Sequence, residues 1–467
     1  MRSSLRFLFG AWLLVSGLAG PARAVEIESN GIIWTLAGDP AHGTFVTGDP
    51  WVVGPVKVTG IRNTLNSPNF TPKPGQNGSM VNPGVTSRQG YDSTLASYDE
   101  SLNAGLINGN PVSADQPLEL PPGSTLVSMV SWLYNSPQDG EPGIPRFNGG
   151  TDTPRPATRS AGVLTVLDRA PEPGSFRPPY SGSDKTVKFN QSMLDYSKLP
   201  KLEPVGSAPN LSSLAQAMAK PWIDHVNEYL GAFIHPSEHM PNYGRDMGEV
   251  VVDSSLALLI TEGGPGANPD KDRILRNLVQ FGIDLTGIAD QGGGWPANGG
   301  HHLGRKWPIL FAGTMLNDPH MKNVGKWETR FQENEQTFYV TQAEVDLTHS
   351  PQWKPDKRAE LVPYSAEDIG MAEWGIRHAT KPETDNRSWD ATYREVNGAV
   401  IPGFALAARL MGLQEAWNHD AFFDYCDRYM KWREEDGRRL SNTASNFLKD
   451  MWTAHRAGAP GKPAAAK

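Results

Sequence analysis

The stretch DKDRILRNLVQFGIDLTGI, residues 270–288, has the spacing of an amphipathic helix. Its apolar residues Ile274, Leu278 and Phe281 recur every three or four positions, which places them on one helix face. Similar patterns continue along the C-terminal half of the chain, and they predict a multi-helix part. Glycine-rich connections between these segments fit antiparallel helix pairs that close on a centre. We therefore expect an (α/α) toroid-type domain over residues 206–456.

The preceding part of the chain has a different pattern. Short β-branched and aromatic runs, such as WVVGPVKVTGI and STLVSMVSWLY, alternate with proline and glycine turn signals. Strands of this length and spacing indicate an all-β, sandwich-like module, which we place at residues 25–205. The expected fold class is α+β with two domains, because a single core rarely exceeds roughly 250 to 300 residues. The tail, residues 457–467, should be disordered.

The first 24 residues have the pattern of a secretory signal peptide. Arg2 and Arg6 precede an apolar stretch that ends in the small-x-small triplet Ala22-Arg23-Ala24. No later stretch has the roughly twenty continuous apolar residues that a membrane helix needs. We expect cleavage after Ala24, a secreted or periplasmic location, and no membrane as a partner of the mature chain.

The mature chain is acidic overall. Removing residues 1–24 takes away three arginines and leaves 40 basic and 51 acidic residues, a net charge of about −11. This balance argues against nucleic acid as a partner, although a local cationic cleft can still bind an acidic polymer. The single cysteine, Cys426, lies in a helical pattern and is expected to be a buried, inert thiol.

Residues 292–313, GGGWPANGGHHLGRKWPILFAG, crowd basic side chains at the expected start of a helix. Positive charge is unfavourable there because of the helix dipole, so we interpret the cluster as a binding site for an anion. The neighbouring tryptophan and asparagine could contact a sugar. The alternative is solvated basic residues on an ordinary helix. The candidate residues of this stretch are Trp295, Asn298, His301, His302, Arg305 and Lys306.

A second candidate lies in residues 354–378, KPDKRAELVPYSAEDIGMAEWGIRH. Tyr364 follows a proline in a loop, where a phenol can point into a cleft. A nearby cation such as Arg358 would lower the pKa of Tyr364 and allow it to exchange protons. The alternative is a tyrosine whose ring is packed and whose hydroxyl bonds to backbone.

Two further segments contribute substrate-binding candidates. Tyr393 and Asn397 lie on one face of a predicted helix and provide an aromatic ring and an amide. An upstream loop combines the aromatic Tyr243 with the basic Arg245. A metal site is not expected, because His235 and His239 are interrupted by Pro236 and have no evident third ligand. The candidates of these segments are Tyr243, Arg245, Tyr393 and Asn397.

Taken together, these motifs resemble polysaccharide lyase family 38, helical-toroid lyases that cleave glucuronan and alginate. The resemblance covers about residues 210–455 and leaves the N-terminal module unexplained. It implies β-elimination at a uronic acid, in which the carboxylate is neutralised, a base removes the neighbouring proton and an acid protonates the leaving oxygen. The implied partner is an acidic polysaccharide, with neither a metal nor an organic cofactor.

The resemblance also implies roles for individual residues. Tyr364 would be the acid, and the base as well if both protons are handled on one face of the sugar. His302 would be the alternative base, with His301 as a fallback. Arg358 would tune Tyr364 or grip the carboxylate. The residues that bind the carboxylate would be Asn298 and Arg305.

Two other functions fit the same sequence. An inverting glycoside hydrolase would use two carboxylates separated widely enough to admit water. Its candidate residues are Asp246, Glu249, Glu373, Asp385 and Asp390. A non-catalytic, secreted carbohydrate-binding protein would use the aromatic residues as platforms. The sequence makes no prediction about oligomeric state.

Overall fold

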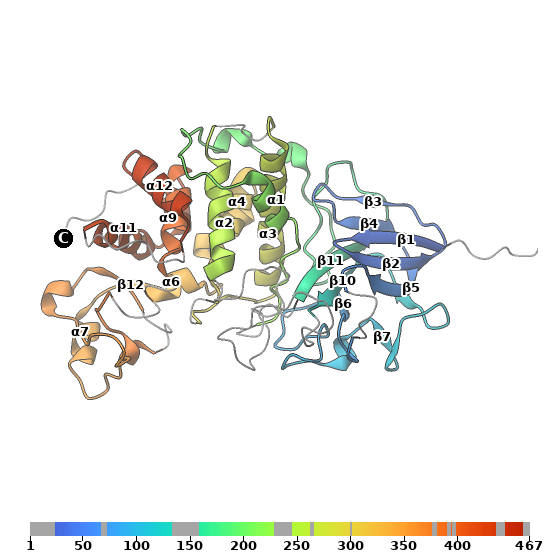
Figure 1. Cartoon of the computed structure of the whole chain (residues 1–467), viewed down its shortest axis with the longest axis horizontal. Coiled ribbons are helices and arrows are strands. Elements are labelled where there is room, and N and C mark those ends of the chain that lie inside the picture. The colour runs from blue at the N-terminus through green and yellow to red at the C-terminus, as the bar shows by residue number, and fades with distance from the viewer. Residues whose placement is uncertain are drawn as a thin grey trace, which may run out of the picture.

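A computed structural model of the chain shows an elongated body with strands at one end and helices at the other (Figure 1). The residues that it describes are 24–66, 72–132, 158–227, 245–261, 266–298, 301–375, 381–389, 394, 398–435 and 444–460. The expected α+β class, with a strand-rich N-terminal part and a helical C-terminal part, is confirmed.

Two sheets build the N-terminal part. The first has the order β1 (Ala24–Ser29), β2 (Ile32–Ala37), β5 (Val56–Asn63) and β9 (Leu118–Leu120), all antiparallel. The second has the order β3 (His42–Thr44), β4 (Pro50–Val53), β11 (Thr158–Leu167), β10 (Ser124–Ser131) and β6 (Ser79–Val81). In the second sheet β4 and β11 run parallel, and the other pairs are antiparallel. A small hairpin joins β7 (Leu106–Ile107) and β8 (Asn110–Pro111).

The two sheets share a core, as a sandwich does. Trp34 and Val58 from the first sheet belong to the same buried cluster as Leu126 and Leu164 from the second. The indole Nε1 of Trp34 donates a hydrogen bond of 2.9 Å to Ser128 Oγ, which satisfies the buried N–H between the sheets.

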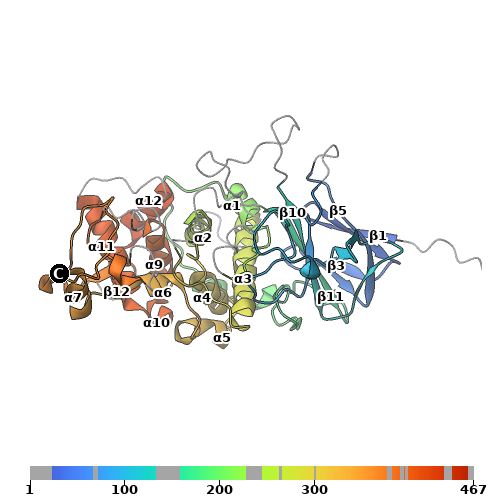
Figure 2. The same ribbon diagram turned by 90° about the horizontal axis from the view of Figure 1, so that it is seen from below.

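Strands β10 and β11 are the middle layer of the molecule, because almost every residue in them is buried. One set of alternate residues faces the first sheet. The other set, which includes Val127, Met129 and Val163, belongs to the core of the helical part. Strands covered on both faces are expected to be rich in apolar residues. β10 and β11 also bury several serines and threonines, of which Ser128 accepts the hydrogen bond from Trp34. The face of the second sheet that points away from the first therefore shares a core with the helices, distinct from the core between the two sheets. Figure 2 shows β10 and β11 next to α3.

The helical part is built around α3, which ends near the second sheet (Figure 1). Asn268 caps α3 by accepting hydrogen bonds from two backbone amides, and Pro269 occupies the first turn, where no N–H donor is needed. Ile274, Leu278 and Phe281 are buried, as the periodicity predicts. The α-helices are α1 (Leu211–Met218), α2 (Arg245–Leu258), α3 (Pro269–Ala289), α4 (Lys306–Met315), α5 (Pro319–Lys322), α6 (Gln332–Gln336), α7 (Gln342–Thr348), α9 (Ile401–Leu410), α10 (Gln414–Trp417), α11 (Asp420–Glu435) and α12 (Asn446–His455).

Smaller elements complete this part of the chain. Within the described residues, the short 3-10 helices are Glu100–Leu102, Gln191–Met193, Tyr196–Lys198, Val324–Lys326, Ala366–Asp368 and Pro382–Thr384. The strands β12 (Thr337–Tyr339) and β13 (Ala372–Trp374) form an antiparallel pair beside α11. No helix in the described ranges is long and apolar enough to cross a membrane.

Several expectations are refined by these bounds. The helix expected at His301 begins at Lys306, because residues 301–304 form turns. Pro402 lies in the first turn of α9, which begins after a break in the helical backbone at residues 399–400. Cys426 is buried, as expected. Residues 1–23 of the expected signal peptide and 461–467 of the expected tail lie outside the described residues.

A buried histidine marks the junction between the sheets and the helices. His225 is packed between Tyr91 and Tyr180, whose rings meet it edge-on with centroids 5.7 Å away in each case. Burial lowers the pKa of His225 from 6.5 to about 3. The imidazole is therefore neutral in the folded protein at all but strongly acidic pH.

This burial predicts acid sensitivity of the junction. Between about pH 6.5 and pH 3 the unfolded imidazole binds a proton that the folded one does not. The free energy of unfolding should then fall by about 1.4 kcal/mol per pH unit as the pH is lowered through this window. Urea unfolding of the parent and of His225→Leu at several pH values measures this, with the exposed His42→Gln as control. A His225→Leu variant with the parental pH slope would contradict the prediction.

Candidate functional site

The basic residues at the start of α4 are buried. His301 and His302 are each 4% exposed, Arg305 is 1% exposed and Lys306 is fully buried. Acidic side chains from distant parts of the chain lie beside these basic residues, although none is close to them in the sequence. The guanidinium of Arg305 donates to both carboxylate oxygens of Asp224, at 2.8 and 3.2 Å. The expectation that Arg305 binds a substrate carboxylate is therefore wrong for this state, because its charge is already paired.

Lys306 lies close enough to a second acidic side chain, that of Glu333, for their charges to interact. Its Nζ donates to the carbonyl of Trp417 at 2.6 Å and to Asn334 Oδ1 at 3.2 Å. Burial lowers the pKa of Lys306 to about 7, and the negative charge of Glu333 opposes this shift. An amine that titrates near neutral pH can lose or donate a proton at working pH.

Glu333 lies on α6 and is completely buried. Its Oε1 accepts a hydrogen bond from the backbone amide of Gly304, and its Oε2 has no hydrogen-bond partner among the described residues. Burial raises the pKa of Glu333, while the nearby charges of Arg305 and Lys306 act in the opposite direction. Glu333 therefore has the environment of a carboxylic acid that can hold a proton.

His302 is held in one orientation by two hydrogen bonds. Its backbone amide donates to Gln332 Oε1 at 2.9 Å, and its ring Nδ1 lies 2.7 Å from the carbonyl of Pro296. Because a carbonyl only accepts, Nδ1 carries a proton, and in the neutral imidazole the lone pair is on Nε2. A neutral imidazole can act as a general base. We call His301, His302, Lys306 and Glu333 the acid–base centre.

A chain of side-chain amides leads away from the acid–base centre. Gln332 donates to Gln336 Oε1 at 2.6 Å, and Gln336 donates to the carbonyl of Gly375 at 3.2 Å. Both glutamines are buried. They connect His302 to the end of β13, where Glu373 and Trp374 lie.

Tyr364 packs in a small buried cluster with Val340 and Val345, separate from the cluster that contains Leu303 and Trp307 beside the acid–base centre. The charges of Glu373, Arg394, Asp385 and Arg428 act on its hydroxyl. The ring is buried, and burial raises the pKa of Tyr364 well above its ordinary value. The expected lowered pKa of Tyr364 is therefore wrong.

Arg358 does not act on Tyr364 either. Its guanidinium is 72% exposed and pairs with Asp356 at 2.7 Å. Although only six residues separate Arg358 from Tyr364 in sequence, one faces solvent and the other faces the core. This geometry does not support either role expected for Arg358, which was to lower the pKa of Tyr364 or to bind the substrate carboxylate.

The other predicted residues near α4 have mixed outcomes. Trp295 is 2% exposed and stacks on Phe331 with ring centroids 5.7 Å apart, so it packs the core and offers no open platform. Asn298 is half-buried, and its carbonyl accepts a hydrogen bond from the amide of His301. The predicted residues that lie outside the described residues are Tyr243, Tyr393, Asn397 and the side chain of Arg245.

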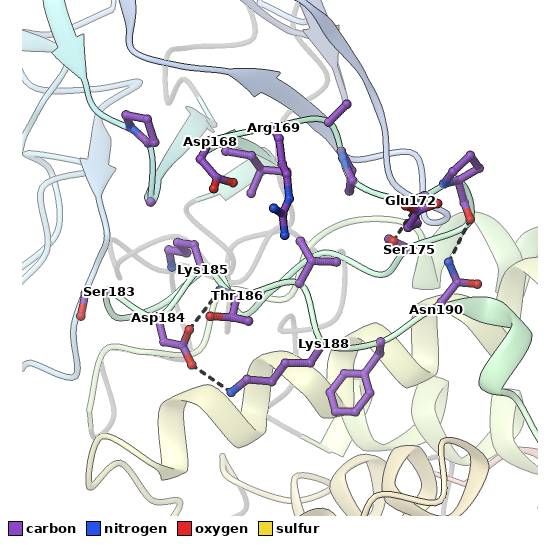
Figure 3. A pocket seen from close by; sticks show the side chains of 18 of the residues that line it. Asp168, Arg169, Glu172, Ser175, Ser183, Asp184, Lys185, Thr186, Lys188 and Asn190 are labelled. Atoms are coloured by element: carbon purple, nitrogen blue, oxygen red, sulfur yellow. Dashed lines mark hydrogen bonds and ion pairs between the residues drawn. The ribbon is translucent and has the colours of Figure 1, made fainter.

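A cavity of about 1390 Å³ lies elsewhere, between the end of β11 and residues 183–192 (Figure 3). Among its charged side chains Asp184 pairs with Lys188, and Lys185 donates to three backbone carbonyls. Asn190 donates to the carbonyl of Pro173. None of the predicted site residues lines it. Because it holds no buried group without a partner, we do not place the functional site there.

Sequence reasoning missed the acidic partner of each cation and the whole of α6. The run QENEQ, residues 332–336, contains only polar residues and would ordinarily face solvent. The one feature of the sequence that points to burial of this run is that it directly follows Phe331, which is buried in the structure. Among the described residues no group of three or more histidine, cysteine or acidic side chains could hold a metal ion.

Comparison with protein-family models, curated proteins and solved structures finds no match to this chain. The site is therefore interpreted from its own geometry.

Arg305 and Arg358 can be compared directly, because Arg305 is paired in the interior and Arg358 is paired at the surface. Arg305→Met leaves Asp224 buried without its partner and should lower the free energy of unfolding by about 3 to 5 kcal/mol. Arg358→Met removes an exposed pair and should change it by less than about 1 kcal/mol. Urea unfolding of both variants measures the difference. Equal stabilities would mean that the Arg305–Asp224 pair is not the buried contact described above.

Proposed function

We propose that the chain is a secreted or periplasmic polysaccharide lyase that cleaves a uronic-acid polymer, of glucuronan or alginate type, by β-elimination. The observation that carries this proposal is the acid–base centre, in which a histidine with its lone pair on Nε2 lies near a lysine with a pKa of about 7 and a buried glutamate. Groups whose pKa values are moved towards neutrality by burial are typical of catalytic sites.

The reaction assigns one task to each group. His302 Nε2 takes the proton from C5 of the uronate, and Lys306 in its charged form neutralises the sugar carboxylate so that this proton can leave. The bond between C4 and the glycosidic oxygen breaks as the C4–C5 double bond forms. Glu333, in its protonated form, donates to the departing oxygen. Because these side chains are buried, the turn at residues 301–304 must move away from α6 when polymer binds.

The arrangement of the helices is the second support. In this proposal the helical part is an open toroid of the (α/α) type. Helix α3 packs against α1, α2 and α4, while α2 also contacts α9 and α12, and α9 contacts α11 and α12. This succession of neighbouring helices places the acid–base centre between α4 and α6, towards the middle of the helical part (Figure 2).

A glycoside hydrolase is the second candidate, and Glu333 is the reason. A buried carboxyl group with a raised pKa is the group that protonates a leaving sugar in such enzymes. The candidate partner Glu373 is held by two arginines, Arg394 at 3.0 Å and Arg428 at 3.3 Å. A hydrolase product lacks the double bond that a lyase product carries.

Activity on polyglucuronate and alginate, followed by the ultraviolet absorbance of the unsaturated product, tests the proposal. Glu333→Gln and His302→Ala should each lower kcat by about 10² to 10⁴-fold, because each removes a proton-transfer group. The exposed Glu328→Gln is the matched control and should retain parental activity. Absence of any absorbing product from either polymer would refute the lyase, whereas cleavage without absorbance would favour the hydrolase.

The pH profile gives a second test of the same centre. Lys306 is charged below its pKa of about 7 and neutral above it, so kcat/KM should fall as the pH rises through 7. Lys306→Arg keeps the charge at every working pH and should abolish this limb. An amine with a pKa of about 7 loses most of its charge between about pH 7 and pH 9. A parental kcat/KM that does not change over this range would show that Lys306 has no such role.

A further inference from the structure

A small pocket lies in the N-terminal part, on residues that the acid–base centre does not use. Its volume is about 380 Å³, which is within the range of pockets that hold small ligands. The end of β5, the segment before β6 and the β7–β8 hairpin supply most of its walls (Figure 1). Five of the side chains that line it are carboxamides, and we call them the amide group. They are Asn63, Asn66, Gln76, Asn77 and Asn103.

Hydrogen bonds from the backbone hold most of the amide oxygens of this group. Asn63 Oδ1 accepts from the backbone amides of Leu65 and Asn66, at 3.2 and 2.9 Å. Gln76 Oε1 accepts from the backbone amide of Lys73 at 2.9 Å. Because the two ends of a carboxamide are in one plane, fixing its oxygen also fixes its nitrogen.

Asn77 is held by two reciprocal hydrogen bonds with Ser131 of β10. Its Oδ1 accepts from the backbone amide of Ser131 at 2.8 Å, and its own backbone amide donates to Ser131 Oγ at 3.1 Å. The φ angle of Asn77 is 55°, a conformation that asparagine adopts more readily than most residues. The wall of the pocket is therefore tied to the second sheet.

Three nitrogens of the amide group have no acceptor within the described part of the chain. They are Asn63 Nδ2, Gln76 Nε2 and Asn77 Nδ2. The other two are in use, since Asn66 Nδ2 donates to Asn77 Oδ1 at 3.4 Å and Asn103 Nδ2 donates to a tyrosine hydroxyl at 3.2 Å. Each free NH₂ group can donate two hydrogen bonds. The pocket thus offers several oriented donors.

The charge of the pocket is balanced. Arg62 is the one charged side chain among its described lining residues, and it pairs with Glu26 at 2.8 Å. Asn66 Oδ1 is the one oxygen of the amide group that accepts no hydrogen bond from a described residue. An anion would enter without an unpaired cation to compensate its charge, which is costly. The ligand that suits this lining is therefore uncharged and brings several acceptor oxygens.

Aliphatic side chains form the rest of the lining. Ile32 and Met129 are buried, Ile61 and Leu106 are partly exposed, and Pro111 is exposed. Leu106 and Pro111 are paired across the β7–β8 hairpin. An apolar wall beside a few fixed polar groups is the usual composition of a small-molecule site. It suits a sugar ring, which has an apolar C–H face and hydroxyl groups around its edge.

We infer that this pocket binds a neutral hexose unit. The hydroxyl oxygens of the sugar would accept from the free nitrogens of Asn63, Gln76 and Asn77, and one hydroxyl would donate to Asn66 Oδ1. The C–H face of the ring would lie against the aliphatic wall at Leu106. This site gives the N-terminal part a binding role, and it does not rest on the proposed lyase activity.

Calorimetric titration of the full chain with D-glucose, D-galactose and D-mannose tests the inference, with D-glucuronate as the charged comparison. At least one of the three hexoses should bind, and more tightly than glucuronate. Gln76→Glu and Asn77→Asp keep the oxygen that the backbone uses and replace the donor by an acceptor, so each should weaken this binding about tenfold. Asn110→Asp is the matched control, because it makes the same change on the hairpin outside the pocket lining. It should bind the hexose as the parent does.

Each outcome bears on the pocket and not on the lyase. Lack of binding by all three hexoses, glucuronate binding as tight as that of the best hexose, or parental affinity in both Gln76→Glu and Asn77→Asp would overturn the site. Weaker binding in these two variants with parental binding in the control would support it, even if no polymer were cleaved. Thermal unfolding without ligand shows that each variant is folded. A variant that unfolds early is replaced by Gln76→Ala, which removes both donors and leaves only the Lys73 amide without its acceptor; it should weaken binding to a similar extent.

Discussion

The architecture depends on buried ion pairs that join distant parts of the chain. Arg177, in the segment between the sheets and the helices, is 1% exposed and lies between two carboxylates. It contacts Asp49, just before β4, at 3.0 Å and Asp284, in α3, at 2.7 Å. Leaving any of these charges without its partner would cost several kcal/mol. The second sheet and α3 are therefore held in one relative position, and the elements that pack on α3 follow from it.

The same constraint acts inside the helical part. Arg305 and Asp224 are 81 residues apart in sequence and form a buried pair. Arg394 and Glu373 form another, at 3.0 Å, with both side chains fully buried. Such pairs fix positions more than they add stability. They hold α4 and β13 in place, so that the acid–base centre has a defined geometry.

The fold class could be predicted because it depends on local periodicity. Ile274, Leu278 and Phe281 show the buried face of α3 in the sequence itself. The basic cluster at α4 was also visible, but its partners were not, because Asp224 and Glu333 are distant in sequence. The polar run of α6 carries the pattern of an exposed helix, and only the tertiary structure buries it. Tyr364 and Arg358 are close in sequence, yet the chain turns one inward and the other outward.

The acid–base centre gives a physical account of how an acidic polymer would be handled. It brings a histidine, a buried lysine and a buried carboxyl group to the turn before α4 and to α6.

The central claim is that the glycosidic bond is broken by elimination, so that no water molecule is consumed. Cleavage of polyglucuronate in water enriched in heavy oxygen, followed by mass spectrometry of the fragments, tests it most directly. Elimination predicts that neither new end takes up the heavy isotope at the moment of cleavage. Fragments that carry one heavy oxygen for each bond broken would contradict the account.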